Sequence, residues 1–284
     1  MMHDAEMGLD PTDIFSSSLE TLYDHQPVTV ASAGSAYEYN LKLASGENVK
    51  LRLMTPDTLP ANWFLHASDI WASSCFLADH ISELGLDTFN DPVTGRRLRL
   101  LELGAAAGLP GILIAKTRGD SVDVTVSDYP DKLLIETLAR NVRLNCVDHS
   151  CRVVAHAWGS DPAALLGNAG EGFDIIIAAD TLWNSSLHAA FIKTLLKALS
   201  PISSARVHLV AGLHTGRYTI RSFLNAAQEA GFEVESVCEM EIKGPRVRVW
   251  SIEVLQDEDH SDRRRWVVWM VLRWKTPTVT EQGT

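Results

Sequence analysis

Hydrophobic and polar residues in the first third of the chain follow two different periods. Residues 37–43 and 48–54 alternate apolar and polar positions around Ser45-Gly46, a pattern typical of a two-stranded hairpin. Over residues 67–84 the apolar positions recur at about 3.6 residues, which predicts an amphipathic helix leading into the core. The polar arm over residues 1–30 is expected to be mobile, and its apolar residues at helical spacing over 14–22 allow one short helix to dock on the core.

A regular alternation of strand and helix patterns begins at residue 98. Strands are predicted at 98–103, 122–127, 152–155, 173–178 and 206–211. Helices are predicted between and after them at 110–117, 131–145, 187–198 and 218–230. Such an alternation is typical of an α/β fold, with a parallel sheet covered by helices on both faces.

Beyond Gly231 the pattern changes to three strand-like segments without helices between them. The sheet is therefore expected to finish antiparallel, and residues 275–284 are expected to fray. We divide the chain into an N-terminal arm with a small β-hairpin, residues 1–66, and a main domain, residues 67–284.

Charge and cysteine usage narrow the possible partners and compartment. The chain has 284 residues, with 36 acidic against 25 basic ones and a net charge of −11, which disfavours nucleic acid or an anionic membrane as the main partner. No run of 18 apolar residues predicts a membrane helix, and the N-terminus lacks a signal-peptide pattern. The four cysteines form no Cys-x-x-Cys pair. These features predict a cytoplasmic or nuclear protein with reduced thiols.

A glycine-rich turn follows the first strand of the alternation, in the segment LELGAAAGLPG. Its small residues Gly104, Ala106 and Gly108 are spaced by two and come just after Glu102. A dinucleotide fingerprint needs a third glycine where Leu109 stands, so a pyrophosphate loop fits poorly. The spacing fits better a turn that packs against the amino-acid part of S-adenosylmethionine. A turn required only for packing is the alternative.

Two carboxylates stand at the ends of later strands. Asp128 lies 20 residues beyond Gly108, where a carboxylate can accept both ribose hydroxyls of an adenosine. Its alternative role is a helix N-cap, because Pro130 follows. Asp180 ends the buried strand FDIIIAA and suits the orientation of an attacking amine. On the next loop Trp183 is suited to sensing a cation with its π face, or simply to packing under the loop.

With these motifs the chain resembles the seven-strand S-adenosylmethionine-dependent methyltransferases. The resemblance runs from about residue 13 to 275 and points to the family-16 branch, which contains protein lysine methyltransferases and fungal nicotinamide N-methyltransferase-like proteins. That branch carries Asp/Glu-x-x-Tyr/Phe after the fourth strand, and Asp180-Thr-Leu-Trp183 occupies this place with a tryptophan. The segment DIWASSCFLADHI resembles the tryptophan-bearing helix before the core, HAWGS the segment bordering adenine, and LVAGLHTGR a turn beside the acceptor.

The resemblance implies a Rossmann-like, mostly parallel seven-stranded sheet and S-adenosylmethionine as cofactor. Cofactor-binding residues are then expected to be Trp71, Glu102, Gly104, Ala106, Gly108, Asp128, Tyr129, Ala157, Trp158 and Ala179. Acceptor-side residues are expected to be Asp180, Trp183, Asn184 and His214, with no metal.

The acceptor stays open at this point. A protein lysine or N-terminal amine is the first candidate. A small metabolite, with chemistry that need not be methyl transfer, is the second. A non-catalytic binding protein is the third. Signatures of metalloproteases, α/β-hydrolases and P-loop NTPases are missing from the sequence.

Three groups of charged or titratable residues outside the motifs are expected to have no role in catalysis. The acidic stretch 257–262 is expected to be a solvated loop, with a cation site as the alternative. Arg263 to Arg265 are expected to form a strand-edge charge run, with a polyanion site as the alternative. His156 and His208 are expected to be ordinary strand residues and not bases.

Overall fold

The computed structural model describes residues 28–89, 95–167, 170–253, 258 and 260–275. The helix expected over residues 14–22 and the fraying expected beyond residue 275 lie outside the described residues.

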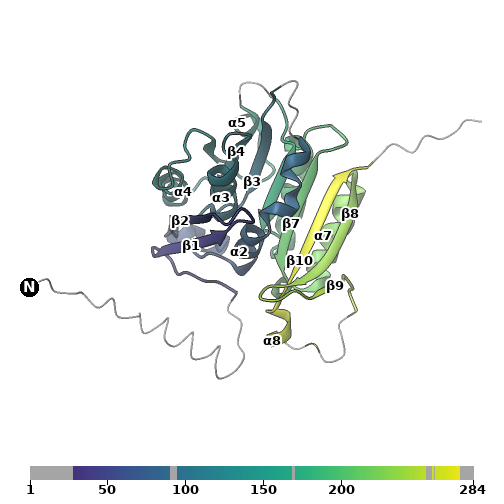
Figure 1. Ribbon diagram of the computed structural model, residues 1–284. Helices are drawn as coiled ribbons and strands as arrows, with labels where there is room; N and C mark the ends of the chain where they lie inside the picture. Colours follow the sequence, from purple (N-terminus) through teal and green to yellow (C-terminus); the bar gives the residue numbers. More distant parts are fainter. Residues whose placement is uncertain (1–27, 90–94, 168–169, 254–257, 259, 276–284) are drawn as a thin grey trace, which may run out of the picture.

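The main sheet is mixed and confirms the predicted α/β class (Figure 1). Its strands run in the order β5-β4-β3-β6-β7-β10-β8-β9. The first five along the chain are β3 (Leu98–Leu103), β4 (Val122–Asp128), β5 (Cys151–Ala155), β6 (Ile175–Ala179) and β7 (Arg206–Gly212), and they pair in parallel. The last three are β8 (Phe232–Glu241), β9 (Val247–Val249) and β10 (Trp266–Trp274), with β10 antiparallel to both β7 and β8. The short edge strand β9 lies within the second strand-like segment predicted beyond Gly231, so the sheet has eight strands where the resemblance implied seven.

The order of the parallel strands creates a crevice at one edge of the sheet. The chain adds β4 and β5 on one side of β3 and then returns to add β6 and β7 on the other. At such a reversal the connections leave in opposite directions, so the space beyond the carboxyl ends of β3 and β6 stays open to a ligand.

Helices cover both faces of the sheet, as the alternation predicted (Figure 1). One face, carrying Leu100 of β3, packs against α2 (Ala72–Asp79), α3 (Leu109–Arg118) and α4 (Lys132–Leu144). The opposite face, carrying Leu101, packs against α5 (Ala163–Leu166), α6 (His188–Ala198) and α7 (Arg217–Glu229). The remaining helices are short: α8 (His260–Arg263), η1 (Pro60–Leu65), η2 (Ile81–Leu84), η3 (Leu86–Phe89), η4 (Ser185–Leu187) and η5 (Leu213–Thr215).

The helix predicted over residues 67–84 is wrong in extent. The segment forms α2 over eight residues only and then the 3-10 helix η2. Trp71 has extended backbone angles and pairs with Thr29 in an isolated bridge, so the helix cannot begin earlier. His80, at φ −114°, ends it. Apolar periodicity marks the buried positions here but does not reveal these two breaks.

The predicted N-terminal hairpin is present and is fastened to α4. Strands β1 (Ala36–Lys42) and β2 (Asn48–Met54) pair antiparallel. The buried amide of Asn141 on α4 accepts from Met54 N–H at 2.8 Å and donates to Met54 C=O at 2.8 Å and Ala107 C=O at 2.9 Å. Hairpin and sheet thereby share one hydrophobic core. The division at residue 66 stays a prediction.

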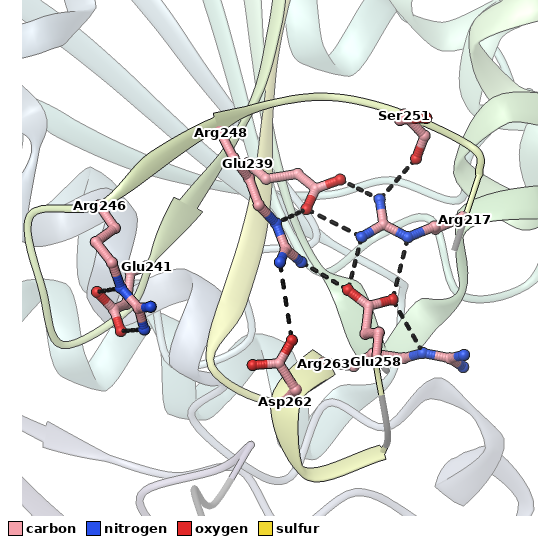
Figure 2. A network of polar contacts seen from close by, with 9 residues as sticks. All are labelled: Arg217, Glu239, Glu241, Arg246, Arg248, Ser251, Glu258, Asp262 and Arg263. Carbon is pink, nitrogen blue, oxygen red and sulfur yellow. Dashed lines mark hydrogen bonds and ion pairs between the residues drawn. The ribbon is translucent and has the colours of Figure 1, made fainter. Parts of the chain in front are cut away.

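The expectation of a solvated acidic loop is wrong for Glu258. Its side chain is buried and binds Arg217 at 2.7 Å and Arg248 at 2.6 Å, and both arginines also contact the buried Glu239 (Figure 2). Buried carboxylates need such partners because the interior solvates charge poorly. The network ties the segment around α8 to the start of α7.

The described part of the chain contains no helix long and apolar enough to cross a bilayer. Its four cysteines are free thiols. A group of three or more metal-ligating side chains is not found among the described residues.

Candidate active site

A pocket opens at the crevice beyond the carboxyl ends of β3, β4 and β6, and it encloses about 840 Å³, part of it open to solvent. Its walls come from the loops after these strands, from the segment after β5 and from η1 with the residues that follow it. The lining residues are Phe64, Leu65, His66, Ala67, Trp71, Gly104, Ala106, Asp128, Tyr129, His156, Ala157, Trp158, Ala179, Asp180, Thr181, Trp183 and Leu187. The volume falls within the usual range for sites that hold a small organic ligand.

The glycine-rich loop forms the floor of the pocket. Gly104 has φ +68°, and a Cβ there would lie 2.8 Å from Thr181 Cγ2 and 3.3 Å from the Trp158 ring, so only glycine fits. Ala106 also takes the left-handed region, at φ +47°. Gly108 differs, because a Cβ there would meet Leu138 and Ile112. It serves close helix packing and is not a lining residue of this pocket.

Asp128 is held by backbone donors at the end of β4. Its Oδ2 accepts from Ala106 N–H at 2.7 Å and its Oδ1 from Tyr129 N–H at 2.7 Å. Burial raises the pKa of this carboxyl to about 6, although both hydrogen bonds favour the charged form. The N-cap of α4 is Asp131, whose Oδ1 accepts from Leu134 N–H at 3.0 Å. Asp128 is therefore free of the capping role that Pro130 suggested.

Glu102 lies below the loop and not in the main pocket. Its Oε2 accepts from Gly111 N–H of α3 at 2.9 Å, and burial raises the pKa of its carboxyl to about 8. The side chain borders a small adjoining cavity that also touches Asp69 and Trp71.

Asp180 lines the pocket, and one of its two carboxylate oxygens has no hydrogen-bond partner in the described chain. Its backbone is left-handed, at φ +51°, and its Oδ1 accepts from Gly212 N–H at 2.7 Å. Its Oδ2 is buried and has no hydrogen-bond partner among the described residues. Burial raises the pKa of the carboxyl, and the nearby His214 and Ser73 oppose that shift. Ser73 Oγ, which is also buried, makes no hydrogen bond of ordinary geometry within the described chain.

Aromatic rings surround Asp180. The His66 ring meets Trp183 edge-on with centroids 4.9 Å apart, and its own carbonyl accepts from the Trp71 indole N–H at 2.9 Å. Trp71 stacks on His214, with centroids 5.5 Å apart and planes 14° apart. His214 Nε2 lies 4.0 Å from Asp180 Oδ1. A buried carboxylate within aromatic walls is an arrangement that suits an amine becoming a cation.

Comparison with known proteins identifies the family of this chain. A family model described as lysine methyltransferase matches residues 65–230. A protein N-terminal and lysine N-methyltransferase efm7 from Schizosaccharomyces pombe is 32% identical over 201 residues, covering 68% of this chain and 72% of that protein. The chain belongs to the lysine methyltransferase family.

Other relatives extend the match along the chain. The Neurospora crassa protein of the same name is 26% identical over 282 residues, 94% of this chain and 87% of that protein. Its counterpart in Gibberella zeae is 30% identical over 221 residues, 72% of this chain and 77% of that protein. Among solved structures, the N-terminal domain of human METTL16 in complex with SAH gives a TM-score of 0.49 at 11% identity over 71% of each chain.

Most of the predicted cofactor residues of this methyltransferase line the same pocket as Asp180. Trp158 packs edge-on against Phe191, with centroids 4.7 Å apart, and Ala157, Tyr129 and Ala179 complete this part of the wall. Glu102 and Gly108 are the two that lie outside the main pocket.

Two predicted acceptor-side residues also lie outside the lining of the methyltransferase pocket. Asn184 turns its side chain to cap η4, where its Oδ1 accepts from Ser186 N–H at 3.1 Å and from Ser186 Oγ at 2.7 Å. His214 stands behind Trp71 and not beside it in the wall.

Sequence reasoning missed the wall formed by Phe64, Leu65 and His66, which comes from a short 3-10 helix without an apolar period. It also assigned His156 to an ordinary strand position, whereas that residue lines the pocket. His208 fits the expectation: it is buried in β7, where burial lowers its pKa to about 4.

Proposed function

We propose that this methyltransferase uses S-adenosylmethionine to methylate an amine of a protein, either a lysine side chain or an N-terminal α-amine. The observation that carries the proposal is Asp180, a buried carboxylate in the pocket whose Oδ2 has no partner among the described residues. An amine N–H is a donor that can satisfy this oxygen. The names of the relatives, which specify N-terminal and lysine amines, support a protein acceptor.

The donor side of the pocket suits S-adenosylmethionine. Each oxygen of Asp128 accepts one backbone N–H and keeps a lone pair for a ribose hydroxyl. Trp158 and Ala157 offer an apolar wall to adenine, and Gly104 exposes backbone to the amino-acid part. The cofactor supplies a methyl group on a sulfonium. The chain's own contribution is then to align the acceptor and exclude water, which is worth roughly 7–11 kcal/mol for well-oriented reactants.

The acceptor side is assigned to Asp180 with Trp183 and His66. Asp180 Oδ2 orients the amine, which arrives neutral after losing its proton to solvent. The carboxylate then stabilises the positive charge that grows on nitrogen, an effect that burial strengthens. The ring of Trp183 adds attraction for the product cation. We place the reaction in the cytoplasm, where the free thiols stay reduced.

The test offers labelled S-adenosylmethionine to a dialysed protein extract and, separately, to its small-molecule fraction. Label is expected on proteins, and acid hydrolysis should recover it as methylated lysine or as a methylated N-terminal residue. Label confined to the small-molecule fraction would replace the protein acceptor by a metabolite. Asp180→Asn serves as the negative control, because it keeps the shape of the side chain and removes its charge.

A further inference from the structure

Three large apolar residues are exposed beside the pocket mouth. The exposed fractions are 45% for Leu59, 64% for Trp63 and 53% for Phe64. We call these three residues the η1 ledge. Phe64 also lines the pocket, so the ledge continues its apolar wall onto the surface. Exposed aromatic clusters of this kind mark contact surfaces, because solvation of such rings is unfavourable.

The ledge is held rigidly in this place. Asp131, the N-cap of α4, accepts from Asn62 Nδ2 at 2.7 Å and from Leu59 N–H at 3.2 Å. The Trp63 indole N–H donates to Thr58 C=O at 3.2 Å. Because the ledge is already fixed before a partner binds, binding costs little conformational entropy, which favours affinity.

The charge of the surrounding chain indicates the kind of partner. Between Arg52 and Arg96 the sequence contains six acidic residues and no lysine or arginine. Two of the six are engaged elsewhere, because Asp87 pairs with Arg118 and Asp79 accepts from Tyr39 O–H. Asp57 is exposed just before the ledge, and Asp69 follows it and borders the small cavity beside Trp71. Lys132, next to Asp131, is paired with Glu136 at 3.9 Å. The ledge therefore combines apolar contact area with a negative field.

We propose that the η1 ledge docks a basic polypeptide segment, with an apolar residue near the target amine, on the protein that is methylated. This inference rests on the proposed function and adds to it the surface that recognises the substrate. A small metabolite would be held within the pocket and has no need of Trp63, which is not a lining residue. The ledge would thus decide which exposed amine enters the site.

The test compares wild type with the double variant Leu59→Ser, Trp63→Ser, neither of which lines the pocket. Label transfer from S-adenosylmethionine to the dialysed extract is expected to fall about tenfold or more, since exposed aromatic anchors dominate interface energies. Cofactor affinity and melting temperature should stay near wild type. Val249→Ser, at an 87% exposed position on β9, is the matched control and should label normally.

A charge variant tests the second part of the proposal. Asp57→Lys is expected to weaken protein labelling several-fold at low salt and much less at high salt, because salt screens exposed charges. Unchanged labelling by the double variant would overturn the docking proposal. An equal loss of cofactor affinity in the double variant would also overturn it, because Trp63 would then stabilise the fold instead of binding the substrate. If wild type labels no protein, the proposed function itself fails, and that result is visible before any variant is compared.

Discussion

The imidazole of His214 stacks on the indole of Trp71, and the close approach of Gly212 makes room for it. A Cβ at position 212 would fall on the imidazole and lie 3.3 Å from Asp180 Oδ1. His214 therefore supports the pocket from behind Trp71, and its Nε2 lies 4.0 Å from Asp180 Oδ1.

This relationship predicts that Gly212→Ala and His214→Ala act through the same contact. Each is expected to lower kcat/KM roughly tenfold, and the double variant should be no worse than His214→Ala alone. Steady-state kinetics of the four proteins checks this. Additive losses would show that Gly212 has a separate role.

Asp180→Asn is expected to lower kcat/KM about a hundredfold or more while cofactor affinity changes little. The amide keeps an oxygen for Gly212 N–H but loses the charge that stabilises the developing cation. Asn184→Ala is the matched comparison: it should leave methyl transfer unchanged and cost about 1 kcal/mol of stability as a lost cap. A large loss of kcat/KM in Asn184→Ala would show that Asn184 contacts the acceptor after all.

Cofactor binding is expected to weaken as the pH falls through about 6, the pKa to which burial raises the Asp128 carboxyl. The ionised form accepts the ribose hydroxyls, and protonation removes that ability on one oxygen. Calorimetric titration with S-adenosylmethionine between pH 5 and 8 measures the step. Asp128→Asn should bind weakly at every pH and lack the step. A wild-type affinity that is flat across this range would contradict the assignment.

Glu102→Gln is expected to stabilise the cofactor-free protein at alkaline pH. Burial raises the pKa of Glu102 to about 8 from an ordinary 4.5, so the native state holds a proton that the unfolded chain releases. Stability therefore falls between pH 4.5 and 8, at most about 1.4 kcal/mol per pH unit. Urea unfolding should show a shallower fall for Glu102→Gln than for wild type. Glu136→Gln, exposed on α4, is the control and should follow wild type.

Arg217→Met is expected to lower the free energy of unfolding by about 3–5 kcal/mol, because it removes one of the two arginines that neutralise the buried Glu239 and Glu258 and leaves only Arg248 shared between them (Figure 2). Lys50→Met removes the exposed pair with Glu38 and should cost less than about 1 kcal/mol. Urea denaturation compares the two. Similar small losses would mean that water enters the network and solvates the carboxylates.

The strands, the long helices and several pocket residues follow from local patterns in the chain. Periodicity and breakers place α4, α6 and α7 within about two residues, because each buries one apolar face. The start of α3 follows from Pro110, since residues 109–115 are all buried and show no period. Asp128 and Asp180 are recognisable because each ends a buried strand, and parallel strands bring their carboxyl ends to one edge of the sheet.

The roles of residues that are close together in the sequence depend on contacts with distant segments. Asp128 and Asp131 look interchangeable as caps in the sequence, and only the bonds to Ala106 and Leu134 separate them. The sequence predicts that Glu258 is an exposed loop residue, but in the fold it is buried and binds Arg217, which is 41 residues away in the sequence.

Local spacing along the chain thus specified the secondary structure, the loop and the two carboxylates, since those features depend on near neighbours and on strand direction. The tertiary structure alone decided the rest: the η1 wall beside the pocket, the place of His214 behind Trp71 and the Asp180 oxygen without a hydrogen-bond partner in the described chain. Each of these depends on which side chains meet across the fold, and no periodicity along the chain encodes that.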